Sequence, residues 1–184
     1  AGRAAEYFLE GTVHAAGTSF HWLKDNLGLL RSVDAADADC RRSEGRVLAL
    51  PAIGCLGAPR WDYETYTAFF GLTSKTRRED LVRAVAEGLA FLLGDIVGAC
   101  RAAGLPIETL RASGGLSRAS YLLQLQSDLL QQPIQALEER EATALGAAIM
   151  AAEGAGLDFR PPALKGPLYA PRVSQLVYQR LIRR

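Results

Sequence analysis

The stretch RASGGLSRASYLLQLQSDLLQQPI, residues 111–134, decides the fold that the sequence predicts. We expect a short strand around TLRAS, which ends at the adjacent glycines Gly114 and Gly115. Ser117 is a suitable N-cap for a helix that extends to about Gln131, because a serine side chain accepts hydrogen bonds from the first N–H groups of a helix. A second strand is expected around PIQAL, residues 133–137. Strand, turn, helix and strand in this order predict an α/β unit.

Alternating strands and helices are predicted on both sides of this unit. Before it, the residues predict a strand at 5–10, a helix from Thr12 or His14 to about Leu30, a loop or short helix at 32–45, strands at 46–54 and 67–73, and a long helix at 77–103. After it, they predict a small-residue helix at 142–156, a polar linker beyond Pro161 and Pro162, and a terminal helix at 173–184. We therefore expect an α/β fold whose helices cover a central sheet.

Apolar residues at helical spacing support the two longer helices. In the first helix they recur at steps of three and four, at Phe20, Leu23, Leu27 and Leu30. In the second they are Leu81, Val85, Leu89, Leu92, Ile96 and Cys100, and Gly104 follows as a stop. An apolar face of this kind is typical of a helix that packs on a core.

Length and composition limit the class of protein. The chain has 184 residues, of which 49% are apolar and 22% are charged, so we expect one globular domain or one lobe of a larger protein. Its net charge of +1 argues against nucleic acid or a membrane as a partner recruited by charge. The first residues lack the apolar core of a signal peptide, and Asp95 interrupts the longest apolar run. We expect a soluble, cytoplasmic protein.

The cysteines and histidines form no known metal-binding motif. Cys40, Cys55 and Cys100 include no CxxC pair, and His14 and His21 are the only histidines. A zinc site or a disulfide framework needs more such residues at closer spacing. We therefore expect free cysteines that pack as small apolar groups in a reducing compartment.

The glycine pair has two interpretations. Because glycine can adopt positive φ and has no Cβ, Gly114 and Gly115 either make a tight turn or leave room for a ligand against bare backbone. The free N–H groups of the next helix would favour an anion or a polar ring there. In α/β folds ligands gather at the carboxyl ends of strands, where this pair lies. Taken alone, the pair favours the simple turn.

Other polar and aromatic residues are equally open to structural explanations. Trp61 and Asp62 lie in a turn-rich loop, where they either serve a function or anchor and cap the loop. His21 has no metal ligand or carboxylate partner nearby in the sequence, which favours a structural role. The sequence contains no Walker A, GxSxG or HExxH motif.

The order of five segments carries more information than any one of them. They are LEGTVHAAGTSFHWLKD, LPAIGCLGAPRWDYETYTAFFGLT, REDLVRAVAEGLAF, SGGLSRASYLLQLQSDLLQQPI and EREATALGAAIMAA. In this order and spacing, from about Tyr7 to Phe159, they resemble the C-terminal domain of the FGGY carbohydrate kinases. Within that family they are most similar to the glycerol kinases.

The resemblance implies a fold and a function. The family has two actin-like lobes of the ribonuclease H type, in which helices flank a central mixed sheet, and it binds ATP with Mg²⁺ and a sugar or polyol between the lobes. Residues 1–160 would form the C-terminal, nucleotide-side lobe, and residues 161–184 a linker and a helix that packs on the same lobe. The reaction would transfer the γ-phosphoryl group of ATP to a hydroxyl group of the sugar or polyol.

The resemblance also assigns nucleotide-binding positions. Gly17 corresponds to the glycine before the family's WL(R/K)D helix, and His21 to the glutamine four residues further on. Gly114 and Gly115 correspond to the two glycines of the family's DGG motif. Ala119 corresponds to the first asparagine of the pair that follows.

This sequence departs from the family pattern near those positions. Ser113 replaces the aspartate, and Ala119 with Ser120 replaces the asparagine pair. We therefore expect fewer side-chain contacts to the nucleotide, while backbone contacts at the glycines remain. Tyr66 and Thr67 stand where glycerol kinases have arginine and glycine, which leaves the identity of the sugar or polyol open.

The resemblance places the catalytic aspartate and most contacts to the polyol in the N-terminal lobe. We therefore assign no catalytic residue to this chain and expect it to be inactive alone; a homo-oligomer is compatible with this interpretation. Two alternatives stay open. One is a non-catalytic lobe that senses nucleotide or binds a partner. The other is an actin-like ATPase of another family, against which the GAPRW and FFGLT segments argue.

Overall fold

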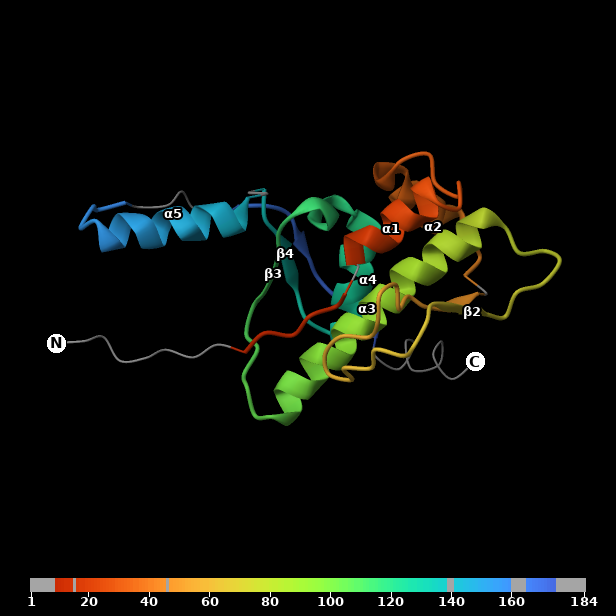
Figure 1. Cartoon of the computed structure of the whole chain (residues 1–184), viewed down its shortest axis with the longest axis horizontal. Helices are drawn as coiled ribbons and strands as arrows, with labels where there is room; N and C mark the ends of the chain where they lie inside the picture. The colour runs from red at the N-terminus through yellow and green to blue at the C-terminus, as the bar shows by residue number, and fades with distance from the viewer. Residues whose placement is uncertain (1–8, 15, 46, 139–140, 160–164, 175–184) are drawn as a thin grey trace.

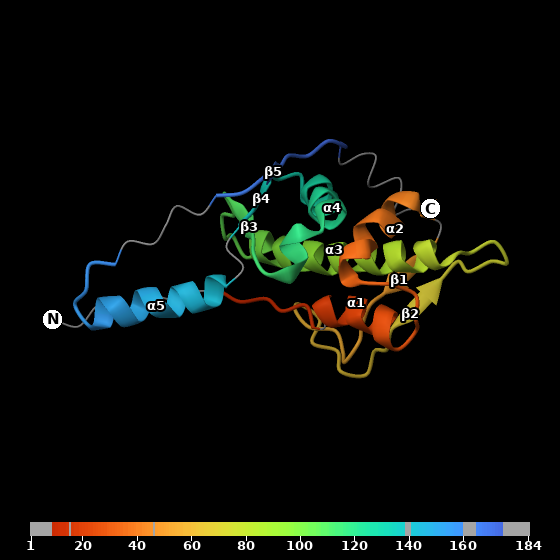
Figure 2. The same ribbon diagram turned by 90° about the horizontal axis from the view of Figure 1, so that it is seen from above.

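A long central helix organises the structure, a computed structural model that describes residues 9–14, 16–45, 47–138, 141–159 and 165–174. Its elements are α1 (Ala16–Asp25), the 3₁₀ helix η1 (Val33–Ala35), α2 (Ala36–Arg42), β1 (Leu48–Leu50), β2 (Ala68–Phe70), α3 (Arg78–Ala102), β3 (Leu110–Ala112), the 3₁₀ helix η2 (Gly115–Arg118), α4 (Ser120–Leu130), β4 (Ile134–Ala136), α5 (Ala142–Gly154) and β5 (Leu168–Tyr169). Figure 1 shows α3 running through the body of the molecule, and Figure 2 shows α5 projecting from it.

The described strands form two small sheets rather than one central sheet. β1 and β2 pair antiparallel, with Ala49 opposite Phe69. β3 and β4 pair parallel, with Arg111 opposite Gln135, and β5 joins the other edge of β4 in the antiparallel sense. β5 lies where the sequence predicted only a polar linker, because a two-residue strand carries no periodic signal. The mixed α/β class is confirmed.

The core is built around α3. The main hydrophobic cluster joins α3 to α1, α2 and α4, and its buried members include Phe20, Leu23, Cys40, Val85, Leu89, Leu122 and Leu125. A second cluster joins the C-terminal part of α3 to α4 and β4 through Val97, Leu123, Leu130 and Ile134. The predicted apolar face of α3 is confirmed at its centre. Toward the end of the helix Cys100 is only half-buried.

Gly88 lets α3 approach β1 closely. It is a buried residue, and a Cβ built on it would lie 2.5 Å from the carbonyl oxygen of Ala49 and 2.6 Å from Cδ of Pro51. No side chain fits at such distances without moving the backbone. A glycine inside a helix lowers its propensity, and this contact explains why the sequence carries one here.

α1 ends earlier than the sequence predicted. The helix stops at Asp25, and Gly28 follows with φ of +64°, a left-handed conformation typical of a helix end. Leu27 is therefore turned outward and is 45% exposed, whereas Leu30 returns to the core and is 5% exposed. The prediction that Leu27 lies on the apolar face was wrong because it assumed helical spacing beyond Asp25, where the chain forms a turn.

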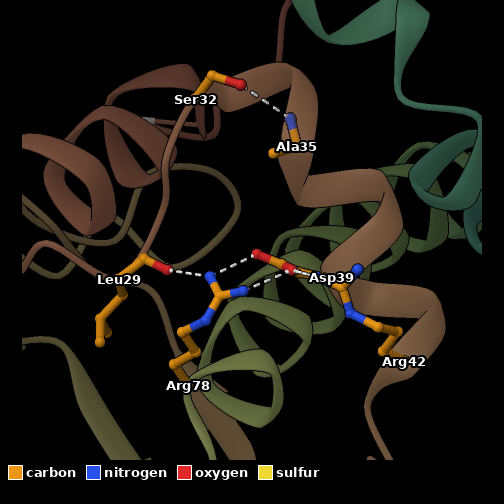
Figure 3. Close-up of polar contacts among 6 residues, drawn as sticks. All are labelled: Leu29, Ser32, Ala35, Asp39, Arg42 and Arg78. Atoms are coloured by element: carbon orange, nitrogen blue, oxygen red, sulfur yellow. Dashed lines mark hydrogen bonds and ion pairs between the residues drawn. The ribbon is translucent and has the colours of Figure 1, made fainter.

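A buried carboxylate fixes α2 on α3. Asp39 accepts hydrogen bonds from both terminal nitrogens of Arg78 and also contacts Arg42 (Figure 3). Arg78 donates a further hydrogen bond, 2.9 Å long, to the carbonyl oxygen of Leu29. The segment predicted as a loop or short helix is therefore an ordered pair of helices, η1 and α2, tied to α3.

Two predicted elements fall largely outside the described residues. These are the strand at 5–10, most of which belongs to residues 1–8, and the terminal helix at 173–184, most of which belongs to residues 175–184. Within the described part of the chain, no helix combines the length and apolar character needed to cross a bilayer.

Candidate functional site

β3 leads directly into the glycine pair. Gly114 has φ of +88° and ψ of −170°, which side chains rarely adopt, so the turn itself requires glycine here. Gly115 begins η2 without a positive φ, and a Cβ built on it would meet no atom within 4 Å. The backbone conformation of the turn therefore explains why residue 114 is a glycine. Neither backbone conformation nor packing explains Gly115, which leaves open space beside its backbone.

Ser117 is not the N-cap of α4, so that prediction is wrong. It lies inside η2, is 8% exposed, and its hydroxyl donates a hydrogen bond of 2.7 Å to the carbonyl oxygen of Gly114. Because η2 takes up residues 115–118, α4 begins only at Ser120. The Ser117 hydroxyl therefore stabilises the glycine turn rather than the start of α4.

The N-terminus of α4 is capped by a distant residue. Asp37 of α2 accepts a hydrogen bond from the backbone N–H of Tyr121 and another, 2.9 Å long, from the hydroxyl of Ser120. Arg41 lies 3.3 Å from the same carboxylate and also donates to the Ser120 hydroxyl. The carboxylate therefore offsets the partial positive charge at this helix start. A phosphate group would have to compete with Asp37 there.

A cavity of about 260 Å³ opens beside this helix start. α1, the η1–α2 segment and the residues between Gly115 and α4 line it. The lining residues are Phe20, Val33, Asp34, Ala36, Asp37, Gly115, Leu116, Arg118 and Ala119. Apolar side chains with a few convergent polar groups are typical of a small-molecule site.

The charged groups of the cavity favour a hydrogen-bond donor over a free anion. Arg118 lies 3.1 Å from the carboxylate of Asp34, and both side chains are more than half exposed. Such an exposed ion pair contributes only about 0–1 kcal/mol to stability. Asp37 adds a second carboxylate, so the lining carries more negative than positive charge.

The structure brings two of the predicted nucleotide-binding residues together at this cavity. Gly115 and Ala119 both line it, four positions apart at the two ends of η2. Gly114 precedes them and sets the direction of the turn without lining the cavity.

The other two predicted residues lie nearby on α1. Gly17 and His21 belong to the helix that contributes Phe20 to the cavity, but neither lines it. His21 is exposed, and its Nδ1 lies 3.7 Å from a carboxylate oxygen of Asp25. The statement that His21 has no carboxylate partner nearby is therefore wrong. The spacing of four residues on a helix brings the two side chains together.

Three charged lining residues were missed from the sequence. Asp34 and Asp37 belong to an acidic segment whose regular aspartates gave no reason to single out one of them. Arg118 follows the glycine pair but belongs to no recognisable motif. The sequence carried no signal for any of the three, because the need for a distant acceptor at α4 follows only from the structure, in which Ala119, a residue that cannot cap a helix, precedes its first residue.

The loop at Trp61 is held by Asp62. One oxygen of Asp62 accepts hydrogen bonds from the N–H groups of Glu64 and Thr65, and the other accepts one from the Thr65 hydroxyl. These bonds, that from the Thr65 hydroxyl above all, lower the pKa of Asp62. Trp61 is 50% exposed and meets the ring of His14 edge to face. Asp62 therefore caps the turn, and Trp61 is not a buried anchor.

The cysteines are free, as predicted. Burial raises the pKa of the Cys40 thiol to about 12, so this thiol stays protonated at neutral pH. In the described ranges, no three His, Cys, Asp or Glu side chains lie together in a way that could hold a metal ion.

Comparison with known sequences identifies relatives of this chain. The profile of the FGGY family of carbohydrate kinases, C-terminal domain, matches residues 2–155. The glycerol kinase of Alkalilimnicola ehrlichii is 39% identical over 195 aligned residues, which include all of this chain and 39% of that protein. The glycerol kinase of Lactococcus lactis is 40% identical over 153 residues, which cover 82% of this chain and 31% of that protein.

Comparison with solved structures gives the same family. Plasmodium falciparum glycerol kinase with ADP superposes with a TM-score of 0.80 at 25% identity, covering 93% of this chain and 36% of that protein. A xylulose kinase from Brucella ovis superposes with a TM-score of 0.75 at 28% identity, covering 91% of this chain and 37% of that one. This chain therefore spans less than two fifths of each relative. Its actin-like fold is confirmed, and it belongs to the FGGY family of carbohydrate kinases, as a C-terminal domain most like that of glycerol kinase.

Proposed function

We propose that this chain is the nucleotide-binding C-terminal lobe of an ATP-dependent carbohydrate or polyol kinase. Together with the rest of the kinase, it would transfer the γ-phosphoryl group of ATP to a hydroxyl group of a sugar or polyol. The main support is the open backbone at Gly115, beside a cavity, at a position that the family resemblance gives to the nucleotide. The P. falciparum glycerol kinase on which this chain superposes carries ADP.

The cavity would take the uncharged part of the nucleotide. Phe20 and Ala119 offer apolar surface to the base, and the carboxylates of Asp34 and Asp37 can accept hydrogen bonds from an amino group. His21 is exposed on the neighbouring helix, where it can stack on the base or bond to it. Open backbone at Gly115 would let the ligand approach the main chain.

The phosphates would lie away from the start of α4, because Asp37 already occupies it. The first turn of α1 contains Gly17, and the first N–H groups of a helix have no partner within the helix, which suits them to an anion. Mg²⁺, when bound, would neutralise charge on the phosphates. The described residues contain no cluster of three His, Cys, Asp or Glu side chains that could hold a metal, so the phosphates would have to supply ligands to Mg²⁺.

The chain would need its partner lobe for catalysis. Phosphoryl transfer depends on the positioning of both substrates, and this site provides groups for only one of them. Closure of two lobes would also exclude water. We therefore expect no polyol-dependent release of ADP from this chain alone, and measurable release would contradict the proposal.

Titration with ADP tests the nucleotide site directly. Isothermal calorimetry of the chain with ADP and with ATP should show saturable binding with a stoichiometry of one. No heat at millimolar nucleotide would refute the assignment of this cavity.

A non-catalytic nucleotide-sensing or partner-binding lobe is the second candidate. It is favoured by Ala119 at a position where the family carries asparagine, because this change removes a side-chain contact without blocking the cavity. The two candidates differ once the chain is combined with the rest of a kinase. A catalytic lobe then supports turnover, whereas a sensing lobe binds ADP without turnover.

A further inference from the structure

A second cavity, of about 330 Å³, lies between the β1–β2 pair and the N-terminal half of α3. Both views of the molecule place β2 beside this part of α3 (Figure 1 and Figure 2). The apolar part of its lining includes Leu48, Leu50, Phe70, Ala84, Phe91 and Leu125. It shares no lining residue with the cavity at Gly115, so the two are separate sites. Its volume falls within the range of about 300–1,000 Å³ that is usual for small-molecule pockets.

The alternation of side chains along the strands gives this cavity an apolar wall. Leu48 and Leu50 lie two positions apart, on one face of the pair, and Leu48 lies opposite Phe70. Phe69 belongs to the other face and packs against the main hydrophobic cluster. Antiparallel sheets commonly combine a core face with a polar, solvated face. Here the second face is apolar as well, although Leu48 is 48% exposed and Phe70 is 57% exposed, and this suits it to contact with an apolar ligand.

One carboxylate stands among these apolar groups. Glu87 lines the cavity from α3, and its side chain is only 14% exposed. Its Oε1 accepts a hydrogen bond of 2.7 Å from Nε of Arg83 and a longer one, of 3.4 Å, from the Tyr121 hydroxyl. Within the part of the chain that the structure describes, Oε2 accepts no hydrogen bond. A carboxylate oxygen largely shielded from water is stabilised when a donor reaches it.

Arg83 determines which charge a ligand can carry. Its guanidinium group lines the same cavity, pairs with Glu87 and donates a hydrogen bond of 2.9 Å to the carbonyl oxygen of Ser43. The ion pair is neutral as a whole, so it offers no net attraction to an anion or to a cation. We propose that this cavity is a second ligand site, which binds an uncharged apolar molecule that donates one hydrogen bond to Oε2 of Glu87.

This site is independent of the proposed nucleotide site, and its test uses no nucleotide. A chain that binds the probe described below but not ADP would refute only the assignment of the cavity at Gly115. A chain that binds ADP but not the probe would refute only the site at Glu87.

Indole and benzofuran form a matched pair of probes. The two molecules have nearly the same shape and apolar surface, but only indole has an N–H donor. Calorimetry with the whole chain should show indole binding with a stoichiometry of one and an affinity at least about tenfold higher than that of benzofuran. Glu87→Met removes the acceptor and should bring the two affinities within about twofold of each other. Absence of saturable indole binding, or equal affinities of the two probes for the wild-type chain, would overturn the proposal.

Leu48→Trp tests the apolar wall without touching the ion pair, and Leu72→Trp is its matched control. Leu48 and Leu72 are 48% and 56% exposed, but of the two only Leu48 lines the cavity. The larger side chain at 48 should weaken indole binding about tenfold or more, whereas the change at 72 should leave the affinity within about twofold. Both variants should keep the melting temperature of the wild-type chain, because both positions are exposed. Equal effects of the two variants on indole binding would contradict the assignment.

Amide NMR spectra locate the bound probe. Indole should shift the signals of residues 48–50 and 83–91 most strongly, because these residues surround the cavity. Largest shifts at residues 115–119 would place indole in the other cavity and would overturn the proposal. The proposal would also be wrong if sedimentation showed a dimer that Leu48→Trp dissociates and that binds no indole, since a second copy of the chain would then cover this face.

Discussion

Arg78 holds Asp39 with both arms of its guanidinium group. Nη1 lies 2.9 Å from one carboxylate oxygen and Nη2 lies 3.1 Å from the other. The Asp39 side chain is 2% exposed, so its charge depends on this partner for solvation. The pair fixes α2 on α3, and α2 in turn carries Asp37 to the cavity and to the start of α4.

Arg78→Ala should therefore destabilise the chain strongly. Loss of one partner from a buried ion pair costs about 3 kcal/mol or more, because the remaining charge is left without compensation. Arg42→Ala is the control, since Arg42 contacts the same carboxylate but is 57% exposed, and it should cost less than about 1 kcal/mol. Urea unfolding of the two variants checks this, and equal losses would show that the buried pair is not the main support of α2.

Gly88→Ala should also destabilise the chain. Its Cβ would press on the Ala49 carbonyl, and overpacking of this kind costs about 1–3 kcal/mol. Gly98→Ala, on the same helix, has no atom within 4 Å of the new Cβ and should stabilise by up to about 1 kcal/mol. Thermal unfolding measures both changes. A neutral Gly88→Ala would mean that α3 can move away from β1 without cost.

Gly115→Val should weaken ADP binding strongly and preserve the fold. The new side chain enters open space that the packing does not need but that the proposed ligand would occupy. We expect an affinity for ADP at least about tenfold lower, with little change in melting temperature. Gly98→Val, remote from the cavity, should leave the affinity unchanged. Wild-type affinity in Gly115→Val would remove Gly115 from the site.

Asp80 should make the stability of α3 depend on pH. It accepts a hydrogen bond from the backbone N–H of Arg77 and another from the Ser43 hydroxyl, in that order of effect, and both lower its pKa below the usual value of 3.8. A pKa lowered by folding gives stability that is present above the unfolded value and is lost as the pH falls through the folded one.

The test for Asp80 compares the wild-type chain with Asp80→Asn. At neutral pH the variant should be less stable by about 1 kcal/mol, the usual size of a lost helix cap. The urea midpoints of the two chains should differ by a constant amount above a pH of 3.8 and should converge as the pH falls from 3.8 through the lowered pKa of the folded state, where the wild-type carboxylate takes up a proton. A difference that stays constant throughout this fall in pH would show that the charge of Asp80 does not matter.

Local patterns predicted most of the helices and strands. α3 was predicted almost to its ends, because a long apolar period identifies a helix without help from the rest of the fold. β5 was missed because it is defined by its pairing with β4, a long-range contact. A strand of two residues is too short to show an alternating pattern in the sequence. The Ser117 cap was assigned wrongly because a 3₁₀ turn after the glycines cannot be told from the first turn of α4 by residue type.

The candidate site was predicted in part. Gly115 and Ala119 come from one short stretch with a recognisable motif, so the resemblance located them. Asp37 reaches α4 across 84 positions of sequence, a contact that only the fold creates. Asp34 and Arg118 meet at the cavity in the same way. Residues that meet through tertiary contacts could therefore not be predicted from the sequence, whereas the motifs supplied Gly115 and Ala119 together with Gly17 and His21, which do not line the cavity.

β3 leads through Ser113 to the glycine turn of the candidate site and, within the described residues, pairs only with β4. A ligand that fixes the turn would restrict this strand, and order imposed on the strand would restrict Gly114 and Gly115. The two events would then share a coupling free energy, which by thermodynamic reciprocity is equal in both directions. A three-residue strand would thus make the stability of the small sheet and occupancy of the proposed nucleotide site report on each other.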